Sequence, residues 1–369
     1  MKIYILYIIL VSIQAIVFKF LDEKNEKKYC NNNLYLSRYK KAFLILSCLE
    51  LIILAGIRGY NIGADCETYL NALRHYRSLP HDKILNAKLI YPYDFEWGYF
   101  LFTKICAWIG LSETVFLFVI AIILYVPIFK YIYKESHCPF LSIFIYFSFG
   151  YFSYSLGIFR QMIAINIMIY ATRYILEKKI VKYIIFLVFA MSFHFTAIIM
   201  LPLYWLCRLD LRKHILKIYM VQVMLFIFGR KLILGILKLF PQYSSYIYSK
   251  YDTSGGNYTH LILLNVILLG LLLMYKNVSI IKDREKLIFA QIIFSIFLQV
   301  IGYQMGIFGR LVNYYSIFLL TIIPNTIGAL FKGKSLIIIN TLLLVFLMLM
   351  FYFQFYNNYY VCPYHFYWE

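Results

Sequence analysis

The chain has 369 residues, of which 63% are hydrophobic and 20% aromatic, while only 14% carry a charged side chain. With a mean hydropathy of +0.73, this composition excludes a water-soluble globular protein of ordinary make-up. The formal charge of +19 could indicate a nucleic-acid partner, but the Lys and Arg residues gather in a few short connections between apolar runs. That distribution is typical of a membrane protein with basic loops, and no nucleic-acid partner is expected.

Apolar runs of roughly 20 residues, the length that a helix needs to cross a bilayer, recur along the whole chain. The alternation of polar and apolar residues that a transmembrane barrel requires is not visible. We therefore predict an all-α fold, a polytopic helical bundle of about ten to twelve spans in a single integral membrane domain, residues 1–369. The first run, IYILYIILVSIQAIVFKF, has no small-residue cleavage site after it and is predicted to be a retained span.

The seven cysteines are scattered without C-x-x-C pairs, and most lie in or beside apolar runs. They indicate neither a disulfide framework nor a zinc site. No metal and no other cofactor is expected from the sequence.

The basic residues predict how the chain is threaded through the membrane. The positive-inside rule places five Lys- and Arg-rich connections in the cytoplasm: 22–41, 173–182, 208–217, 276–286 and 332–334. The outer segments are then 58–96, 241–260 and the tail YNNYYVCPYHFYWE, which has no Lys or Arg. This assignment alternates over four late spans, near 260–275, 287–305, 311–331 and 335–355.

The apolar stretch around His194 does not fit a simple alternation. If the basic connections on both sides of it are cytoplasmic, it must enter and leave the membrane within about 25 residues, too few for two full spans. Either a broken or re-entrant helix pair lies here, or one ordinary span leaves a few positive charges on the wrong side. The sequence leaves both interpretations open, and the same question arises at Gly110, Leu111 and Ser112.

Ionisable residues beside the apolar runs are the candidates for function, because such groups are costly at membrane depth. Arg58 and Asp65 lie in the segment LAGIRGYNIGADCETY, where Gly59 and Gly63 permit tight turns beside a ligand. Glu96 begins the next apolar run, in YPYDFEWGYF.

Later in the chain, Arg160 and Gln161 are predicted to open a helix, whose N-terminal amides would favour an anion. Arg310 precedes RLVNYYSIFLLTIIP in the same way, and His194 lies at the apex of the possible re-entrant pair. With the predicted topology, all these candidates approach one another at the outer face. Several Arg residues and a few carboxylates there suit a ligand that carries phosphate and sugar hydroxyls.

Each candidate also has a structural interpretation. His194 could make a hydrogen bond to a neighbouring helix, Arg160 and Arg310 could be anchors at span ends, and Asp65 could be a solvated loop acid. Two Arg residues on the outer side run against the usual topological bias, which favours a functional interpretation.

Glu50 lies inside the apolar segment KKAFLILSCLELIILAG. We interpret it as structural, with its carboxylate satisfied by Ser47 or by Gln14 of the first span. The alternative is a proton-coupled transporter whose activity depends on Glu50.

Six stretches follow one another in an order that brings a known family to mind. They are IRGYNIGADCETYLNAL, DFEWGYFLFTKICAWIG, SLGIFRQMIAINIMIYATRYILEKK, FAMSFHFTAIIMLPLYWL, GRLVNYYSIFLLTIIP and PYHFYWE. With this order and spacing, the chain resembles the EpsG and Wzy-like family of bacterial polysaccharide polymerases over nearly its whole length. In the family the loop motif commonly reads Gly-Thr-Asp followed by Tyr, whereas here it is Gly63, Ala64, Asp65 and Cys66, so any role of that hydroxyl is not carried over.

The resemblance implies a membrane glycosyltransferase that joins oligosaccharide repeat units at the outer, periplasmic face of the bacterial cytoplasmic membrane, without a metal. The donor would be a glycan on undecaprenyl pyrophosphate and the acceptor a lipid-linked repeat unit. The product would be O-antigen, capsule or exopolysaccharide. Besides membrane lipid, the resemblance leaves open a chain-length regulator as a further partner.

Such a reaction displaces lipid pyrophosphate from an anomeric carbon, and Arg residues can stabilise the charge that builds on this leaving group. The residues predicted to bind pyrophosphate are Arg160 and Arg310, with Arg58 and Gln161 in support. The attacking hydroxyl also needs a base. The candidates for that catalytic role are Asp65, His194 and Glu96, and the first two are preferred.

Other functions are compatible with the same residues. A lipid-linked oligosaccharide flippase or transporter should show two related halves, which are not apparent. An O-antigen ligase would share the lipid donor and differ chiefly in its acceptor. A membrane O-acyltransferase would use a His with a close polar partner in sequence, whereas Ser192 and Thr196 are the only polar neighbours of His194.

Overall fold

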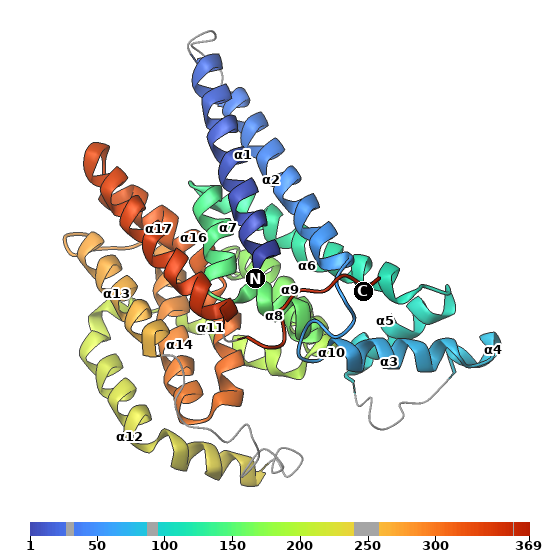
Figure 1. Cartoon of the computed structure of the whole chain (residues 1–369). Coiled ribbons are helices and arrows are strands. Elements are labelled where there is room, and N and C mark those ends of the chain that lie inside the picture. The colour runs from blue at the N-terminus through green and yellow to red at the C-terminus, as the bar shows by residue number, and fades with distance from the viewer. Residues whose placement is uncertain (27–32, 87–94, 240–257, 357) are drawn as a thin grey trace. The chain divides into compact units, whose positions relative to one another are not determined.

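The computed structural model describes residues 1–26, 33–86, 95–239, 258–356 and 358–369. These residues form helices, with one isolated β-bridge between Arg58 and Phe366 (Figure 1). The predicted all-α class is therefore confirmed. The described residues divide into two compact units, which we call unit 1 (1–167, 189–195 and 320–369) and unit 2 (168–188 and 196–319). The assignment of the chain to a single domain stays a prediction.

Several helices of the described residues are long and apolar enough to cross a membrane. The five that reach this length unbroken are α1 (Lys2–Glu26), α6 (Glu113–Glu135), η2 with α12 (Leu211–His214 and Ile215–Leu239), α14 (Asp283–Gln304) and α17 (Gly333–Tyr356). Two bent pairs raise the number to seven if each counts as one span: α7 with α8 (Pro139–Ser148 and Tyr151–Gly157), bent by 59°, and Gly306–Ser316 with α16 (Leu319–Leu330), bent by 54°. This is fewer than the ten to twelve spans predicted, because runs such as 97–108 and 180–193 form helices too short for a complete span.

The remaining helices are shorter, or carry more polar residues. They are α2 (Asn33–Gly56), α3 (Cys66–Arg77), α4 (His81–Ile84), α5 (Trp97–Trp108), α9 (Phe159–Leu176), α10 (Ile180–Phe193), η1 (Phe195–Met200), α11 (Leu203–Leu206), α13 (Tyr258–Met274), η4 (Gly306–Val312) and α15 (Asn313–Ser316). The four late spans predicted from the sequence correspond to α13, α14, the bent pair ending in α16, and α17. The question left open at Gly110, Leu111 and Ser112 is answered by a break between α5 and α6.

In unit 1, α1 and α2 lie side by side along their length (Figure 1). The side chain of Gln14 on α1 donates to the carboxylate of Glu50 on α2, and Ser47 Oγ donates to Gln14 Oε1 at 3.3 Å. The structural interpretation of Glu50 is therefore supported by its contacts, since a membrane-embedded carboxylate needs donors from a neighbouring helix.

The tail after α17 pairs with the loop that follows α2. Gly59 N donates to His365 O at 2.7 Å, Gly63 N to Tyr360 O at 2.7 Å, and Tyr367 N to Ile57 O at 3.1 Å. Figure 1 shows the tail running past the start of that loop. The two segments therefore lie on the same side of the membrane, as the charge distribution predicts for 58–96 and the tail.

The loop also packs very closely on α8. Gly63 adopts a φ of +109°, and a Cβ there would lie 1.9 Å from the carbonyl oxygen of Leu156. Next to this contact, the guanidinium of Arg58 is 1% exposed and donates to the carbonyl oxygens of Ala55, Ile62 and Leu156, at 2.5, 3.3 and 3.1 Å. Arg58 and Gly63 thus hold the loop in one conformation against α8.

In unit 2, three basic connections contact one another. Lys178 pairs with Asp283 at 3.6 Å, and Arg212 donates to the carbonyl oxygens of Tyr275 and Val278 at 2.7 and 2.9 Å. The basic connections 173–182, 208–217 and 276–286 therefore lie together, on one side of the membrane.

Between the first two of these connections, α10 leads away and η1 with α11 returns. Tyr183 OH on α10 donates to Met200 O at 2.6 Å, and the rings of Tyr183 and Tyr204 are 5.6 Å apart. The helix ends at Phe193, just before His194. The structure therefore favours the re-entrant pair over the single span.

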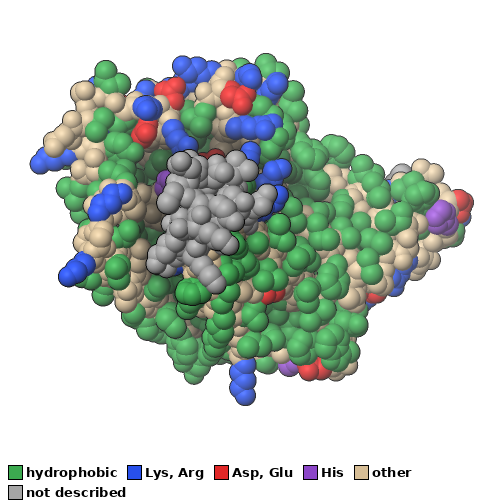
Figure 2. All heavy atoms as spheres, turned by 90° about the horizontal axis from the view of Figure 1, so that it is seen from above, with side chains coloured by type: hydrophobic (Ala, Val, Ile, Leu, Met, Phe, Trp, Pro, Cys, Tyr) green, Lys and Arg blue, Asp and Glu red, His purple; other side chains and the backbone are tan. Residues whose placement is uncertain are grey.

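The surface agrees with a membrane location. Hydrophobic side chains cover most of the face in Figure 2, and Lys and Arg occur on it in groups. Large apolar side chains also stand exposed along the candidate spans, such as Ile16 of α1 at 71%, Leu216 of α12 at 77% and Ile337 of α17 at 67%. Apolar surface of this extent is stable against lipid and not against water.

We predict that Gly63→Ala destabilises the protein strongly, because the new Cβ would meet the Leu156 carbonyl and the backbone would keep a left-handed φ. The expected loss is at least about 3 kcal/mol in the free energy of unfolding. Gly110→Ala is the matched control, since Gly110 has a φ of +74° but nothing within 4 Å of its Cβ position. Thermal unfolding in detergent, followed by intrinsic fluorescence, should show a much larger fall in Tm for Gly63→Ala; equal falls would contradict the close contact.

Candidate functional site

The carboxylate of Glu96 joins three segments of unit 1. Its Oε1 accepts from His194 Nδ1 at 2.9 Å and from the backbone N–H of Phe195 at 3.1 Å. Its Oε2 accepts from a terminal nitrogen of Arg160 at 2.5 Å. We call Glu96, Arg160 and His194 the Glu96 cluster. The structure thus brings together three of the residues that the sequence predicts for the site.

The local backbone explains why these residues meet. Glu96 immediately precedes α5, Arg160 is the second residue of α9, and His194 follows the last residue of α10. A Cβ on Gly98 would lie 2.4 Å from Ser192 Oγ and 2.7 Å from Ser192 O, so only glycine lets the start of α5 approach the end of α10 this closely. The contact at Gly98 therefore positions Glu96 beside His194.

Arg160 lies among aromatic rings. Its guanidinium carbon is 4.9 Å from the ring centroid of Phe95 and 5.9 Å from that of Tyr69. The Tyr69 ring in turn stacks on Phe159, with centroids 4.7 Å apart. Arg160 Nε is buried and makes no hydrogen bond to any residue that the structure describes. The rings fix the plane of the guanidinium, and a ligand oxygen could accept from Nε.

Glu96 is ionised at neutral pH. Burial would raise its pKa, but the hydrogen bond from His194 and the positive charge of Arg160 outweigh burial and lower the pKa from 4.5 to about 2. An ionised carboxylate can only accept hydrogen bonds, so Nδ1 of His194 must be the donor in their contact. In a neutral His194 ring, Nε2 is then the nitrogen that is free to accept a proton.

Four other predicted site residues are not members of the Glu96 cluster. Arg58 is buried under the loop and donates to backbone carbonyls. Asp65 precedes α3, and its carbonyl oxygen accepts from Tyr69 N at 3.2 Å. Gln161 follows Arg160 on α9 and is 4% exposed. Arg310 belongs to unit 2, and its role in pyrophosphate binding stays a prediction, as do those of the other three.

The helix predicted to start at Arg310 differs in the structure. Arg310 lies inside the 3-10 helix η4, which is followed by the short α15 and then, after a bend, by α16. A Cβ on Gly302 of α14 would lie 2.6 Å from the Cα of Gly309. This close contact between two glycines holds η4 against α14. A long helix that started at residue 310 would not include Gly309 and would not make this contact. Among the described residues, no group of three His, Cys, Asp or Glu side chains could hold a metal ion.

One protein-family model matches most of the chain. A model described as the EpsG family matches residues 41–366, a range that contains the whole Glu96 cluster. The chain belongs to the EpsG family. A search of curated proteins and a search of solved structures returned no match. The resemblance noted in the sequence is therefore confirmed, and membership indicates a membrane protein of polysaccharide biosynthesis.

In this EpsG-family chain, the sequence did not indicate the aromatic partners of Arg160. Tyr69 lies one helical turn after Asp65, and Phe95 directly precedes Glu96. Both were within the quoted stretches, but aromatic residues make up 20% of the chain. With so many aromatic residues, the sequence does not distinguish the few that contact Arg160.

We predict that the stability contributed by the Glu96 charge depends on pH. Because the pKa is lowered in the folded protein, this contribution is complete above about pH 4.5 and is lost as the pH falls through about 2. Glu96→Gln should therefore lower the free energy of unfolding by about 3 kcal/mol at pH 7. Its Tm difference from the wild type should narrow steadily between pH 5 and pH 3.

The control is Asp82→Asn, which removes an exposed carboxylate on the short α4. This variant should keep the wild-type Tm across the same pH range. A Glu96→Gln difference that stays constant with pH would show that the charge is not what stabilises the cluster.

Proposed function

We propose that this EpsG-family protein is a polysaccharide polymerase, a membrane glycosyltransferase that joins oligosaccharide repeat units carried on undecaprenyl pyrophosphate. The observation that carries the proposal is the Glu96 cluster, in which a histidine with a defined tautomer lies beside a guanidinium that has a spare donor. Acid–base chemistry and binding of a phosphate oxygen are the two requirements of glycosyl transfer from a lipid pyrophosphate.

In this proposal, His194 is the general base. A hydroxyl oxygen of the acceptor sugar attacks the anomeric carbon of the donor, and its proton passes to His194 Nε2. The bond between the anomeric carbon and the pyrophosphate oxygen breaks, and the lipid pyrophosphate leaves with the bonding electrons. The ionised Glu96 keeps the ring in the correct tautomer and stabilises the imidazolium that forms, so it orients the base and does not act as the base itself.

Arg160 is assigned to the leaving group. Negative charge builds on the pyrophosphate as the bond breaks, and a preorganised guanidinium stabilises this charge more than the charge of the ground state. Arg160 uses one terminal nitrogen for Glu96, which leaves Nε available for an oxygen of the ligand. A planar guanidinium suits two oxygens of a phosphate better than a Lys ammonium does.

The topology of unit 1 supports a site on the outer side. Lys40, in the basic connection predicted to be cytoplasmic, donates to Ser136 O just after α6 at 2.8 Å. At the opposite end of α6, Glu113 pairs with Arg74 of α3 at 3.0 Å. Arg74, in the predicted outer segment, is thus at the end of α6 away from the basic connection, and the positive-inside rule assigns that end to the outside.

We predict that His194→Ala and Arg160→Ala each lower the initial rate of glycan lengthening by about 100-fold or more, through loss of the base and of charge stabilisation. Arg160→Lys should not restore the rate, because the planar donor arrangement is lost. The measurement uses purified protein in nanodiscs with undecaprenyl-pyrophosphate-linked repeat units and EDTA, and products are resolved by length.

Two exposed residues provide matched controls. His137→Ala removes a histidine in the turn between α6 and α7, and Arg208→Ala removes an arginine that stacks on Tyr204. Both should keep the wild-type rate. Rates that are indifferent to His194 and Arg160 would contradict the assigned site, a single addition in place of a ladder would favour a ligase, and loss of all lengthening in EDTA would contradict a metal-independent reaction.

A further inference from the structure

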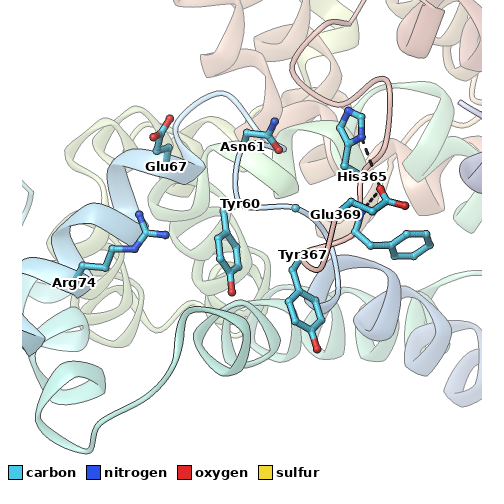
Figure 3. Close-up of a pocket in the computed structure, with 9 residues that line it drawn as sticks. Tyr60, Asn61, Glu67, Arg74, His365, Tyr367 and Glu369 are labelled. Carbon is cyan, nitrogen blue, oxygen red and sulfur yellow. Dashed lines mark hydrogen bonds and ion pairs between the residues drawn. The ribbon is translucent and has the colours of Figure 1, made fainter.

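A cavity of unit 1 lies between the loop after α2, helix α3 and the tail (Figure 3). Its volume is about 430 Å³, which is within the range of roughly 300–1,000 Å³ for small-ligand sites. The residues of the Glu96 cluster are not among those that line it. The cavity therefore requires an explanation of its own.

The walls of the cavity are fixed by contacts on both sides. On the loop, Tyr60 OH shares a hydrogen bond with Thr114 Oγ1 at 3.0 Å, and Arg74 of α3 lies over the Tyr60 ring at 5.7 Å. On the tail, the backbone hydrogen bonds to the loop hold residues 360–367, and Phe366 N donates to Glu369 Oε2 at 3.1 Å. A ligand would meet a preformed site, which lowers the cost of binding.

The lining combines aromatic rings with hydrogen-bond acceptors. In Figure 3 the rings of Tyr60 and Tyr367 extend in the same direction, with Glu67 of α3 to one side and Glu369 of the tail to the other. Asn61 adds an amide to the same cavity. Rings of this kind pack on the apolar C–H faces of a sugar, while carboxylates and amides accept hydrogen bonds from its hydroxyls.

The charge of the cavity is unfavourable for a phosphate. Arg74 is the arginine that lines the cavity. Its guanidinium is already paired with Glu113 at 3.0 Å and donates to Asn71 at 2.9 Å. Glu67 and Glu369 add two carboxylates that line the same space, and His365, which also lines it, has its Nδ1 3.8 Å from Glu369 Oε2. A negatively charged pyrophosphate would be repelled, whereas an uncharged sugar would not.

Helix α3 separates the cavity from the Glu96 cluster. Its residues Glu67 and Arg74 line the cavity. Tyr69 is buried on the opposite face, where its ring contacts Arg160. Positions 67 and 74 lie on the same face of a helix, and position 69 lies about 200° around the helix axis from position 67. One short helix thus contributes to both places.

We propose that this cavity is a glycan-binding subsite that holds a short, uncharged saccharide portion of the substrate, away from the pyrophosphate. The source of the saccharide rests on the proposed function, whereas the chemistry of the ligand rests on the lining alone. The subsite would hold the substrate while its reacting end lies at the Glu96 cluster.

Isothermal titration calorimetry on the full chain in nanodiscs tests this subsite. The probe is the free repeat-unit oligosaccharide released by mild acid from the lipid-linked precursors of the host cell, and inorganic pyrophosphate is the anion probe. Tyr367→Ala should weaken oligosaccharide binding by about tenfold or more, and the isosteric Glu67→Gln by about fivefold. Tyr359→Ala is the matched control, since Tyr359 is in the same tail, 90% exposed and outside the cavity, and should bind as the wild type does.

Neither cavity variant should change pyrophosphate binding. The inference would be overturned if the wild type bound no oligosaccharide at millimolar concentration, if the cavity variants bound it as tightly as the wild type, or if pyrophosphate displaced it. In the lengthening assay, Tyr367→Ala should raise KM and leave kcat unchanged, the opposite of His194→Ala.

The two proposals fail in different ways. Loss of oligosaccharide binding in Tyr367→Ala, in a protein that lengthens no glycan, would support the subsite and overturn the polymerase assignment. Lengthening that requires His194 and Arg160, together with unchanged oligosaccharide binding in the cavity variants, would support the polymerase assignment and overturn the subsite.

Discussion

The ionised carboxylate of Glu96 is the group on which the arrangement of unit 1 depends. Its side chain is 21% exposed, and removing a carboxylate from water is costly unless donors replace the lost hydration. Three donors do so here, from the end of α10, from the start of η1 and from α9. Residues 96, 160 and 194–195 are far apart in sequence, and the hydrogen bonds to one carboxylate hold them in one geometry.

The same charge determines the chemistry that each member of the cluster can perform. A carboxyl group with a pKa of about 2 binds protons too weakly to serve as a base at neutral pH. It can hold His194 Nδ1 as a donor, however, and thereby leave Nε2 as the acceptor. It also repels a phosphate, so a pyrophosphate can approach only where Arg160 outweighs that repulsion. The proposed roles of base, orienting group and anion-binding group are therefore all argued from one set of contacts.

Much of this architecture could be predicted from the sequence, since hydropathy and the positions of Lys and Arg are directly visible there. The late spans followed from such patterns, and so did Ser47 or Gln14 as the partner of Glu50. The same patterns left a re-entrant pair and a single span around His194 equally open. The number of spans did not, because length and hydropathy do not reveal that 97–108 and 180–193 form short helices. The 3-10 helix around Arg310 was not predicted either, and it lies where Gly309 closely approaches Gly302 of α14, a contact that hydropathy and charge do not reveal.

For the site, too, residue types could be read from the sequence, whereas contacts between distant residues could not. Residue type identified Glu96, Arg160 and His194 as candidates, but not that Glu96 is the partner of the other two. That relation requires the approach of Gly98 to Ser192, two small residues that no motif marks. Arg58 is a residue whose type alone does not decide its role, and its part in pyrophosphate binding stays a prediction. As a membrane-edge arginine it suggested an anion site, yet its contacts with Ala55, Ile62 and Leu156 are those of a group that closes a loop. Where three backbone carbonyls already occupy a guanidinium, binding a phosphate would require breaking the loop that the guanidinium stabilises. Arg160 Nε makes no hydrogen bond to any residue that the structure describes. Arg160 is therefore the better candidate to bind the pyrophosphate leaving group.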